Sequence, residues 1–124
     1  WEPFAKLRHL EVFGTDPYWL LANQPVETVG QYSKALKRLC DKTNREAQIW
    51  IQGFKIPAGK EDEVAQAIDM ATEAGIENIH TWGFEACHHL SWIRCEDSQK
   101  VWNLIVRKFQ EKAGLPHKEP SAIL

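Results

Sequence analysis

Hydrophobic and polar residues along the chain repeat one pattern three times. A short β-rich run is followed each time by a segment with apolar residues at three- and four-residue steps, which is the periodicity of a helix. The predicted strands are residues 10–15, 47–54 and 78–84. The apolar stripes of the predicted helices are Val29, Tyr32, Leu36 and Leu39, then Val64, Ala67, Ile68 and Ala71, and finally Val101, Trp102, Ile105 and Phe109. Alternating strands and helices predict parallel strands joined by right-handed crossovers.

Turn residues mark where these elements end. Asp16 and Pro17 end the first strand, because proline cannot continue a central strand. Gly75 stands where a left-handed C-terminal cap of the second helix belongs. We therefore expect residues 1–115 to contain the three strand–helix units, and residues 116–124 to form a loose polar tail.

Each predicted strand has two chemically different faces, because successive side chains point to opposite sides. One face is small and aliphatic, and we expect it to lie beneath helices; it comprises Leu10, Val12 and Gly14, Ile49, Ile51 and Gly53, and Ile79, Thr81 and Gly83. The other face is polar and aromatic; it comprises Glu11, Phe13 and Thr15, Gln48, Trp50 and Gln52, and His80, Trp82 and Phe84.

Two α/β architectures fit this pattern. A flavodoxin-like three-layer sheet has helices on both faces, so its central strands read as continuous apolar runs. Burying Glu11, Gln52 and His80 unpaired in such a sheet would cost about 1–3 kcal/mol per group. The interior of a barrel accepts polar groups near its mouth. The pattern therefore favours the C-terminal three βα units of a (β/α)8 TIM barrel.

Three units are only part of such a barrel. We expect the remaining barrel strands to come from another segment or chain, or the open face to be covered by self-association, because soluble monomers avoid large exposed aromatic patches. The chain starts at Trp1 without an initiator methionine or a signal segment, which we interpret as a sign of a longer protein.

Composition narrows the class of protein. The chain has 124 residues, 44% of them hydrophobic and 26% charged, which is typical of one soluble globular unit. A net charge of −2 gives no electrostatic reason to expect nucleic acid or an anionic membrane as a partner. No apolar run approaches the roughly 18–20 residues that span a bilayer. Three cysteines without CxxC spacing indicate reduced thiols in a cytoplasmic protein.

Candidate chemistry gathers where the strands end. In barrel enzymes the site is built from the C-terminal strand ends and the loops that follow them. Here those segments are residues 15–19, 52–55 and 82–89, and each of them combines polar groups with aromatic rings. Rings can stack on the faces of sugars while amides and carboxylates bond the hydroxyl groups. The sequence therefore predicts a carbohydrate ligand.

Two carboxylates are candidate catalytic residues. Asp16 ends the first strand and could act as general acid, general base or nucleophile, or it could simply initiate a turn before Pro17. Glu85 lies two strands away, at a backbone separation of about 10 Å. Side chains could close this to the roughly 5–9.5 Å that separates glycosidase carboxylates.

Candidate ligand-binding residues surround these two carboxylates. They are Tyr18, Trp19, Trp50, Gln52, Lys55 and Trp82. Gln52 could bond a sugar hydroxyl or hold a carboxylate in place, and Lys55 could bind an anionic group or remain a solvated loop lysine. We interpret His80 as a core histidine. We expect no cofactor and no resident metal, because Cys87-His88-His89 lacks the spacings CxxC and HxxxH.

The ordered motifs TDPYW (residues 15–19), QIWIQGF (48–54) and TWGFEAC (81–87) resemble the last three units of glycoside-hydrolase-like TIM barrels. The resemblance covers residues 10–109. It implies that Trp82 corresponds to the tryptophan that lines the sugar subsite after the eighth strand. Gln52 stands where retaining enzymes carry their nucleophilic glutamate, and the fourth strand, which carries their acid/base, lies outside this chain.

The leading hypothesis is a carbohydrate-active, glycoside-hydrolase-like barrel. One alternative is a catalytically inactive barrel that binds a sugar or a protein, since Gln52 cannot serve as a carboxylate nucleophile. Another alternative is a metal-dependent barrel hydrolase that uses Asp16 with His88 or Cys87.

Overall fold

The computed structural model describes residues 1–123 of this chain. Strands β1 (Val12–Thr15), β2 (Glu46–Gln52) and β3 (Asn78–Trp82) form one parallel sheet in the order β1-β2-β3. Between and after them lie α2 (Glu27–Thr43), α3 (Glu61–Glu73) and α4 (Ser98–Lys112). A short α1 (Glu2–Ala5) precedes β1, and the 3-10 turn η1 (Phe84–Cys87) follows β3. The predicted α/β class with parallel strands is confirmed.

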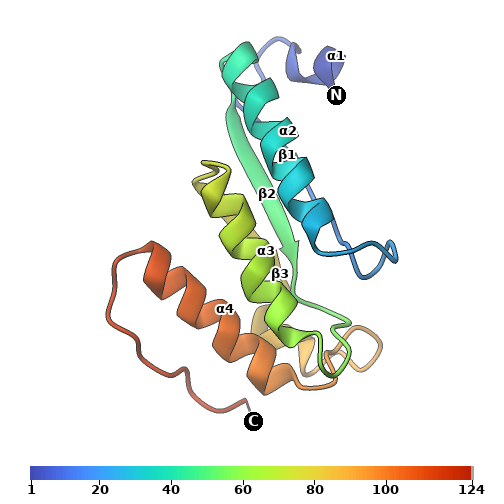
Figure 1. Ribbon diagram of the computed structural model, residues 1–124, viewed down its shortest axis with the longest axis vertical. Coiled ribbons are helices and arrows are strands. Elements are labelled where there is room, and N and C mark those ends of the chain that lie inside the picture. The colour runs from blue at the N-terminus through green and yellow to red at the C-terminus, as the bar shows by residue number, and fades with distance from the viewer. Residues whose placement is uncertain (124) are drawn as a thin grey trace.

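The helices α2, α3 and α4 lie on one side of the sheet (Figure 1). Beneath them Ile49, Ile51 and Ile79 join residues of the three helices in one buried cluster. A flavodoxin-like sheet would carry helices on both faces, so residues 1–123 do not form that three-layer alternative. The other face of the sheet is open.

The predicted C-terminal cap at Gly75 is confirmed, and further capping residues mark the ends of α2 and α4. The Asp97 side chain accepts a hydrogen bond from the backbone N–H of Lys100 at 2.9 Å and so caps the start of α4. Gly75 follows α3 and Gly114 follows α4, with φ of 83° and 67°. These left-handed conformations end each helix at little steric cost because glycine has no Cβ. Asn44 ends α2 in the same region, with φ of 53°.

The face assignment predicted for the first strand is wrong. In the sheet Phe13 pairs with Ala47, and Gly14 pairs with Gln48. Paired residues of neighbouring strands point to the same side, so Phe13 faces the helices, whereas Val12 and Gly14 lie on the open face. The four-residue strand has too little alternation to fix its own phase. A Cβ at Gly14 would lie only 3.2 Å from the carbonyl oxygen of Gln48, so the first strand needs a small residue there.

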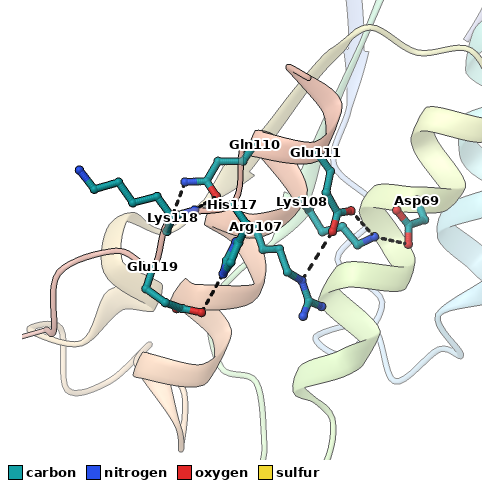
Figure 2. A network of polar contacts seen from close by, with 8 residues as sticks. All are labelled: Asp69, Arg107, Lys108, Gln110, Glu111, His117, Lys118 and Glu119. Carbon is teal, nitrogen blue, oxygen red and sulfur yellow. Dashed lines mark hydrogen bonds and ion pairs between the residues drawn. The ribbon is translucent and has the colours of Figure 1, made fainter. Parts of the chain in front are cut away.

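The tail after α4 adopts no helix or strand up to residue 123, but it runs back along α4 (Figure 1). Figure 2 shows the side-chain amide of Gln110 pairing with both backbone groups of Lys118, at 3.0 Å to the N–H and 2.9 Å to the carbonyl. Further on, the N–H of Ile123 donates to Gln99 at 2.7 Å. The tail expected to be loose is therefore exposed but tied to α4 at two positions.

Within residues 1–123, no helix combines the length and the apolar composition that crossing a bilayer requires. The three cysteines, Cys40, Cys87 and Cys95, are free and buried.

Candidate functional site

The open face of the sheet carries polar and aromatic side chains at alternate positions. On β2 these are Gln48 and Trp50, and on β3 they are Asn78, His80 and Trp82. The rings of Trp50 and His80 stack with centroids 4.6 Å apart and planes 16° from parallel. The His80 ring is half-buried on the face without helices, and its Nε2 is hydrogen bonded to Asn78, as expected of a structural histidine.

Hydrogen bonds between these side chains hold the rings in place. The indole N–H of Trp50 donates to Gln48 Oε1 at 2.9 Å. Asn78 donates its amide N–H to Glu46 at 2.8 Å, which leaves its oxygen to accept from His80 Nε2 at 2.6 Å. The amide oxygen of Asn78 thus faces the imidazole ring and helps to hold it on the open face. The polar atoms of the open face thus bind one another, and parts of the ring surfaces remain exposed.

Three adjoining hollows follow the carboxyl ends of the strands. The central hollow, of about 520 Å³, is lined by Gly14, Thr15, Asp16, Tyr18, Gln48, Trp50 and Trp82. It shares Asp16 and Tyr18 with a hollow of about 390 Å³ toward α2, and Trp50 and Trp82 with one of about 360 Å³ that also contacts Phe84 and Leu90. We call these three hollows together the strand-end groove.

Aromatic rings contact one another along this groove. Phe54, which follows β2, packs edge-on against both Tyr18, at 5.1 Å, and Trp82, at 5.3 Å between ring centroids. Phe54 is buried, whereas Trp82 keeps 41% of its surface exposed. The rings of Tyr18 and Trp82 thus both pack against the buried ring of Phe54. Phe54 was not among the candidate binding residues, although its place directly after β2 is a signal that could have identified it.

Asp16 lies at the end of β1 and is exposed in the groove. Its backbone carbonyl accepts a hydrogen bond from the N–H of Tyr18 at 2.8 Å, so the residue also forms the expected turn. Burial of the Tyr18 ring, together with the nearby Asp16 carboxylate, raises the pKa of the Tyr18 hydroxyl. That hydroxyl stays protonated at neutral pH and can donate a hydrogen bond.

Glu85 lies in an unusual backbone turn after β3. Glu85, Ala86 and Cys87 all have left-handed φ values of 47°, 50° and 58°. Each such residue costs about 1–3 kcal/mol, and the conformation persists only where its surroundings enforce it. Here the carbonyl of the buried Ala86 accepts hydrogen bonds from Ser98 Oγ, at 3.3 Å, and from the N–H of Cys95, at 3.4 Å. No feature of the amino-acid sequence indicated this turn.

The turn directs the Glu85 carboxylate toward His89, whose Nε2 lies 3.6 Å from Glu85 Oε2. Glu85 lines none of the three hollows, whereas Asp16 lines two of them. The two candidate catalytic carboxylates are therefore not brought together in the strand-end groove.

Gln52 occupies the end of β2 and is fully buried. Its Oε1 accepts hydrogen bonds from the N–H groups of Leu20 and Leu21, at 3.2 and 3.3 Å, and its Nε2 donates to the carbonyl of Phe54 at 2.9 Å. The side chain holds the loop after β1 against the end of β2, and it does not line the groove. A binding role for Gln52 therefore has no support in the geometry.

Trp19 and Lys55 also lie outside the central hollow. Trp19 is 1% exposed, and its indole N–H donates to Glu63 of α3 at 2.8 Å. It therefore anchors the loop after β1 to the helix layer, and it also lines the hollow toward α2. The Lys55 ammonium is exposed and lies 5.9 Å from the ring centroid of Trp92. Of the six candidate ligand-binding residues, Tyr18, Trp50 and Trp82 meet in the central hollow.

A metal site is not assembled from the residues considered in the sequence. Among residues 1–123, no three His, Cys, Asp or Glu side chains are placed to hold a metal ion together. Cys87, a ligand only in the metal-dependent alternative, is buried, and burial raises the pKa of its thiol.

No protein family, curated protein sequence or solved structure matched this chain. The chemistry of the strand-end groove is therefore the basis on which a function can be inferred. That groove combines the exposed carboxylate of Asp16, the hydroxyl of Tyr18 and the rings of Trp50 and Trp82.

Proposed function

We propose that this chain forms three βα units of a glycoside-hydrolase-like (β/α)8 barrel that binds a carbohydrate in the strand-end groove. The observation that supports this most strongly is the meeting of Tyr18, Trp50 and Trp82 beside Asp16 in one hollow. Sugar rings present apolar C–H faces and polar hydroxyl edges. Indole and phenol rings suit the faces, and a carboxylate and a phenolic hydroxyl suit the edges.

The barrel assignment is supported by the sheet. Its strands are parallel and in consecutive order, with α2, α3 and α4 on one side, as in the wall of a barrel. Within residues 1–123, the outer edges of β1 and β3 pair with no further strand. All-parallel sheets are normally covered on both faces and extended at both edges. In this proposal, strands of another segment or chain complete the barrel and enclose the aromatic face.

The catalytic part of the proposal concerns Asp16. Glycosidases use two carboxyl groups on either side of the scissile bond. Asp16 is the one Asp or Glu that lines the groove among the described residues, and Glu85 faces His89. Hydrolysis would therefore need a second carboxylate from the remaining strands, with Asp16 as acid, base or nucleophile. The single carboxylate equally favours a second candidate, a barrel that binds a sugar without cleaving it.

A titration with neutral oligosaccharides tests the proposal. We expect cello-, xylo-, manno- or N-acetylchito-oligosaccharides to change the tryptophan fluorescence and to release or absorb heat in calorimetry. Trp82→Ala removes a stacking surface and should weaken binding about tenfold, or about 1.4 kcal/mol. The matched control is Trp92→Ala, since Trp92 is 73% exposed but lines none of the three hollows.

If none of the oligosaccharides releases or absorbs heat or changes the tryptophan fluorescence, carbohydrate binding is refuted. An equal loss of affinity in Trp82→Ala and Trp92→Ala would show that the groove is not the binding site. Release of shorter sugars during the titration would distinguish a hydrolase from a protein that only binds.

A further inference from the structure

The strand-end groove has an unusual charge distribution. The chain contains 15 Lys and Arg residues, yet none of them lines any of the three hollows. In the central hollow, Asp16 carries the one formal side-chain charge at neutral pH. The central hollow is therefore negative although the protein as a whole is almost neutral, with a net charge of −2.

The aromatic residues reinforce this charge. The face of an aromatic ring carries negative potential, and it attracts cations placed over it within about 6 Å of the ring centroid. Trp50 and Trp82 border the same hollow as Asp16, and the phenol of Tyr18 lies between the central hollow and its neighbour. Stacking on His80 occupies one side of the Trp50 ring and fixes its plane. A carboxylate beside rigid rings is an environment that favours a positively charged group.

We propose that the groove selects a cationic sugar, one that carries a free ammonium group, over neutral and anionic sugars. This inference rests on the proposed carbohydrate function and names the class of sugar. The ammonium would form a charge-assisted hydrogen bond with Asp16 and contact the rings that line the central hollow. Uronates, sugar phosphates and sulfated sugars would meet the Asp16 carboxylate with a charge of the same sign and without a Lys or Arg to compensate.

Two matched ligands test this inference. Glucosamine tetramers and N-acetylglucosamine tetramers differ in whether the nitrogen carries a charge, so we would compare their affinities by calorimetry at about pH 5.5. At that pH the amines of the glucosamine tetramer are protonated, whereas the N-acetylated nitrogens carry no charge. We expect the glucosamine tetramer to bind about tenfold more tightly, with the advantage falling as salt concentration rises.

Variants identify the group responsible. Asp16→Asn should remove the advantage of the charged tetramer and leave the affinity for the N-acetylated one nearly unchanged. Asp16→Glu keeps the charge and should retain the preference. Asp62→Asn is the control, because Asp62 is an exposed carboxylate on α3 that lines none of the three hollows. Circular dichroism of each variant would verify that the fold is retained.

The outcomes separate this inference from the proposal on which it rests. Equal affinity for the two tetramers, or tighter binding of a uronate tetramer, would overturn the preference for cations and leave carbohydrate binding intact. Retained preference in Asp16→Asn would also overturn it. Failure of every tetramer to bind would overturn both.

Discussion

The two faces of the three-stranded sheet are stabilised by different interactions. On the helix side, Ile49 and Ile51 of β2 are fully buried in one apolar cluster with α2, α3 and α4. On the open side of the same strand, Gln48 and Trp50 are half-buried, and their polar atoms bond to each other. Adjacent residues of a single strand therefore belong to two different environments.

This difference indicates what each face contributes. The helix side gains free energy from the removal of apolar area from water, about 25 cal/mol per Å². The open side gains less from burial, and hydrogen bonds among Trp50, His80 and their neighbours orient its rings instead. Substitutions on the helix side should consequently affect the stability of the fold, and those on the open side should affect binding.

The largest effect should follow from a cavity on the helix side. Ile51→Ala removes a side chain that is fully buried, and the cost of such a substitution is about 2–5 kcal/mol. Urea unfolding followed by far-UV circular dichroism measures it. His80→Ala, one strand away on the open face, is the comparison, and we expect it to lose less than half as much. Equal losses would mean that the two faces contribute alike to stability.

The next largest loss of stability should follow from a substitution at Gln52, the buried residue at the end of β2. Gln52→Glu replaces the amide N–H that bonds the carbonyl of Phe54 with an acceptor that cannot donate. Leaving a buried polar group unsatisfied costs about 1–3 kcal/mol, and a charge would add to this. Thermal or urea unfolding checks the loss. Gln48→Glu is the matched control on the open face, because a carboxylate there can still accept from Trp50.

The same variant tests the resemblance to retaining glycosidases. If Gln52 were an inactive substitute for a nucleophile, Gln52→Glu would produce hydrolysis of aryl glycosides. We expect no hydrolysis, because the side chain is enclosed beneath the backbone of Leu20 and Leu21. Turnover by Gln52→Glu, with the stability unchanged, would contradict the structural role.

Much of the fold could be predicted from periodicity. The alternation of Gln48, Ile49, Trp50 and Ile51 identifies both faces of β2, because seven residues in one strand give a clear period of two. The strand β1 has four residues, and a glycine among them hides the phase. Its faces were therefore assigned the wrong way round.

The site was less predictable than the fold. Asp16, Trp50 and Trp82 were found because parallel strands bring their carboxyl ends to one edge. Gln52 and Trp19 fill the space beneath the loop after β1, and this depends on how that loop folds back, which has no period in the sequence. The left-handed turn that directs Glu85 toward His89 has no sequence signal, because it contains none of the glycines that usually mark such a backbone.

A third effect is a loss of stability at alkaline pH, and it arises from a buried thiol, Cys95. Burial raises the pKa of the Cys95 thiol from 9.0 to about 11, and its Sγ donates to the carbonyl of Gly53 at 3.5 Å. Between these two pH values the unfolded chain releases the proton and the folded chain keeps it. The stabilisation that the protonated Cys95 thiol contributes should therefore be present in full below about pH 9. The free energy of unfolding should decline as the pH rises toward 11.

Urea titrations at several pH values measure this decline, and Cys95→Ala should make it shallower. In the folded protein at about pH 8, a disulfide reagent should leave all three thiols unmodified, since each of them is buried. An equally steep decline in Cys95→Ala, or rapid modification of the folded protein, would place the thiol in a more open environment.

The smallest effect concerns the outer surface of the helix layer, where ion pairs link α3 and α4. Figure 2 shows Lys108 of α4 between Asp69 of α3, at 2.9 Å, and Glu111, at 2.8 Å. Both carboxylates are about half exposed, and exposed ion pairs contribute about 0.2–1 kcal/mol. Asp69→Asn should therefore lower the free energy of unfolding by less than about 1 kcal/mol, and by less still in high salt. A double-mutant cycle with Lys108→Met isolates the pair. A coupling as large as the loss in Ile51→Ala would mean that charge, rather than apolar burial, holds α4 on α3, and the contrast between the two faces of the sheet would lose its physical basis.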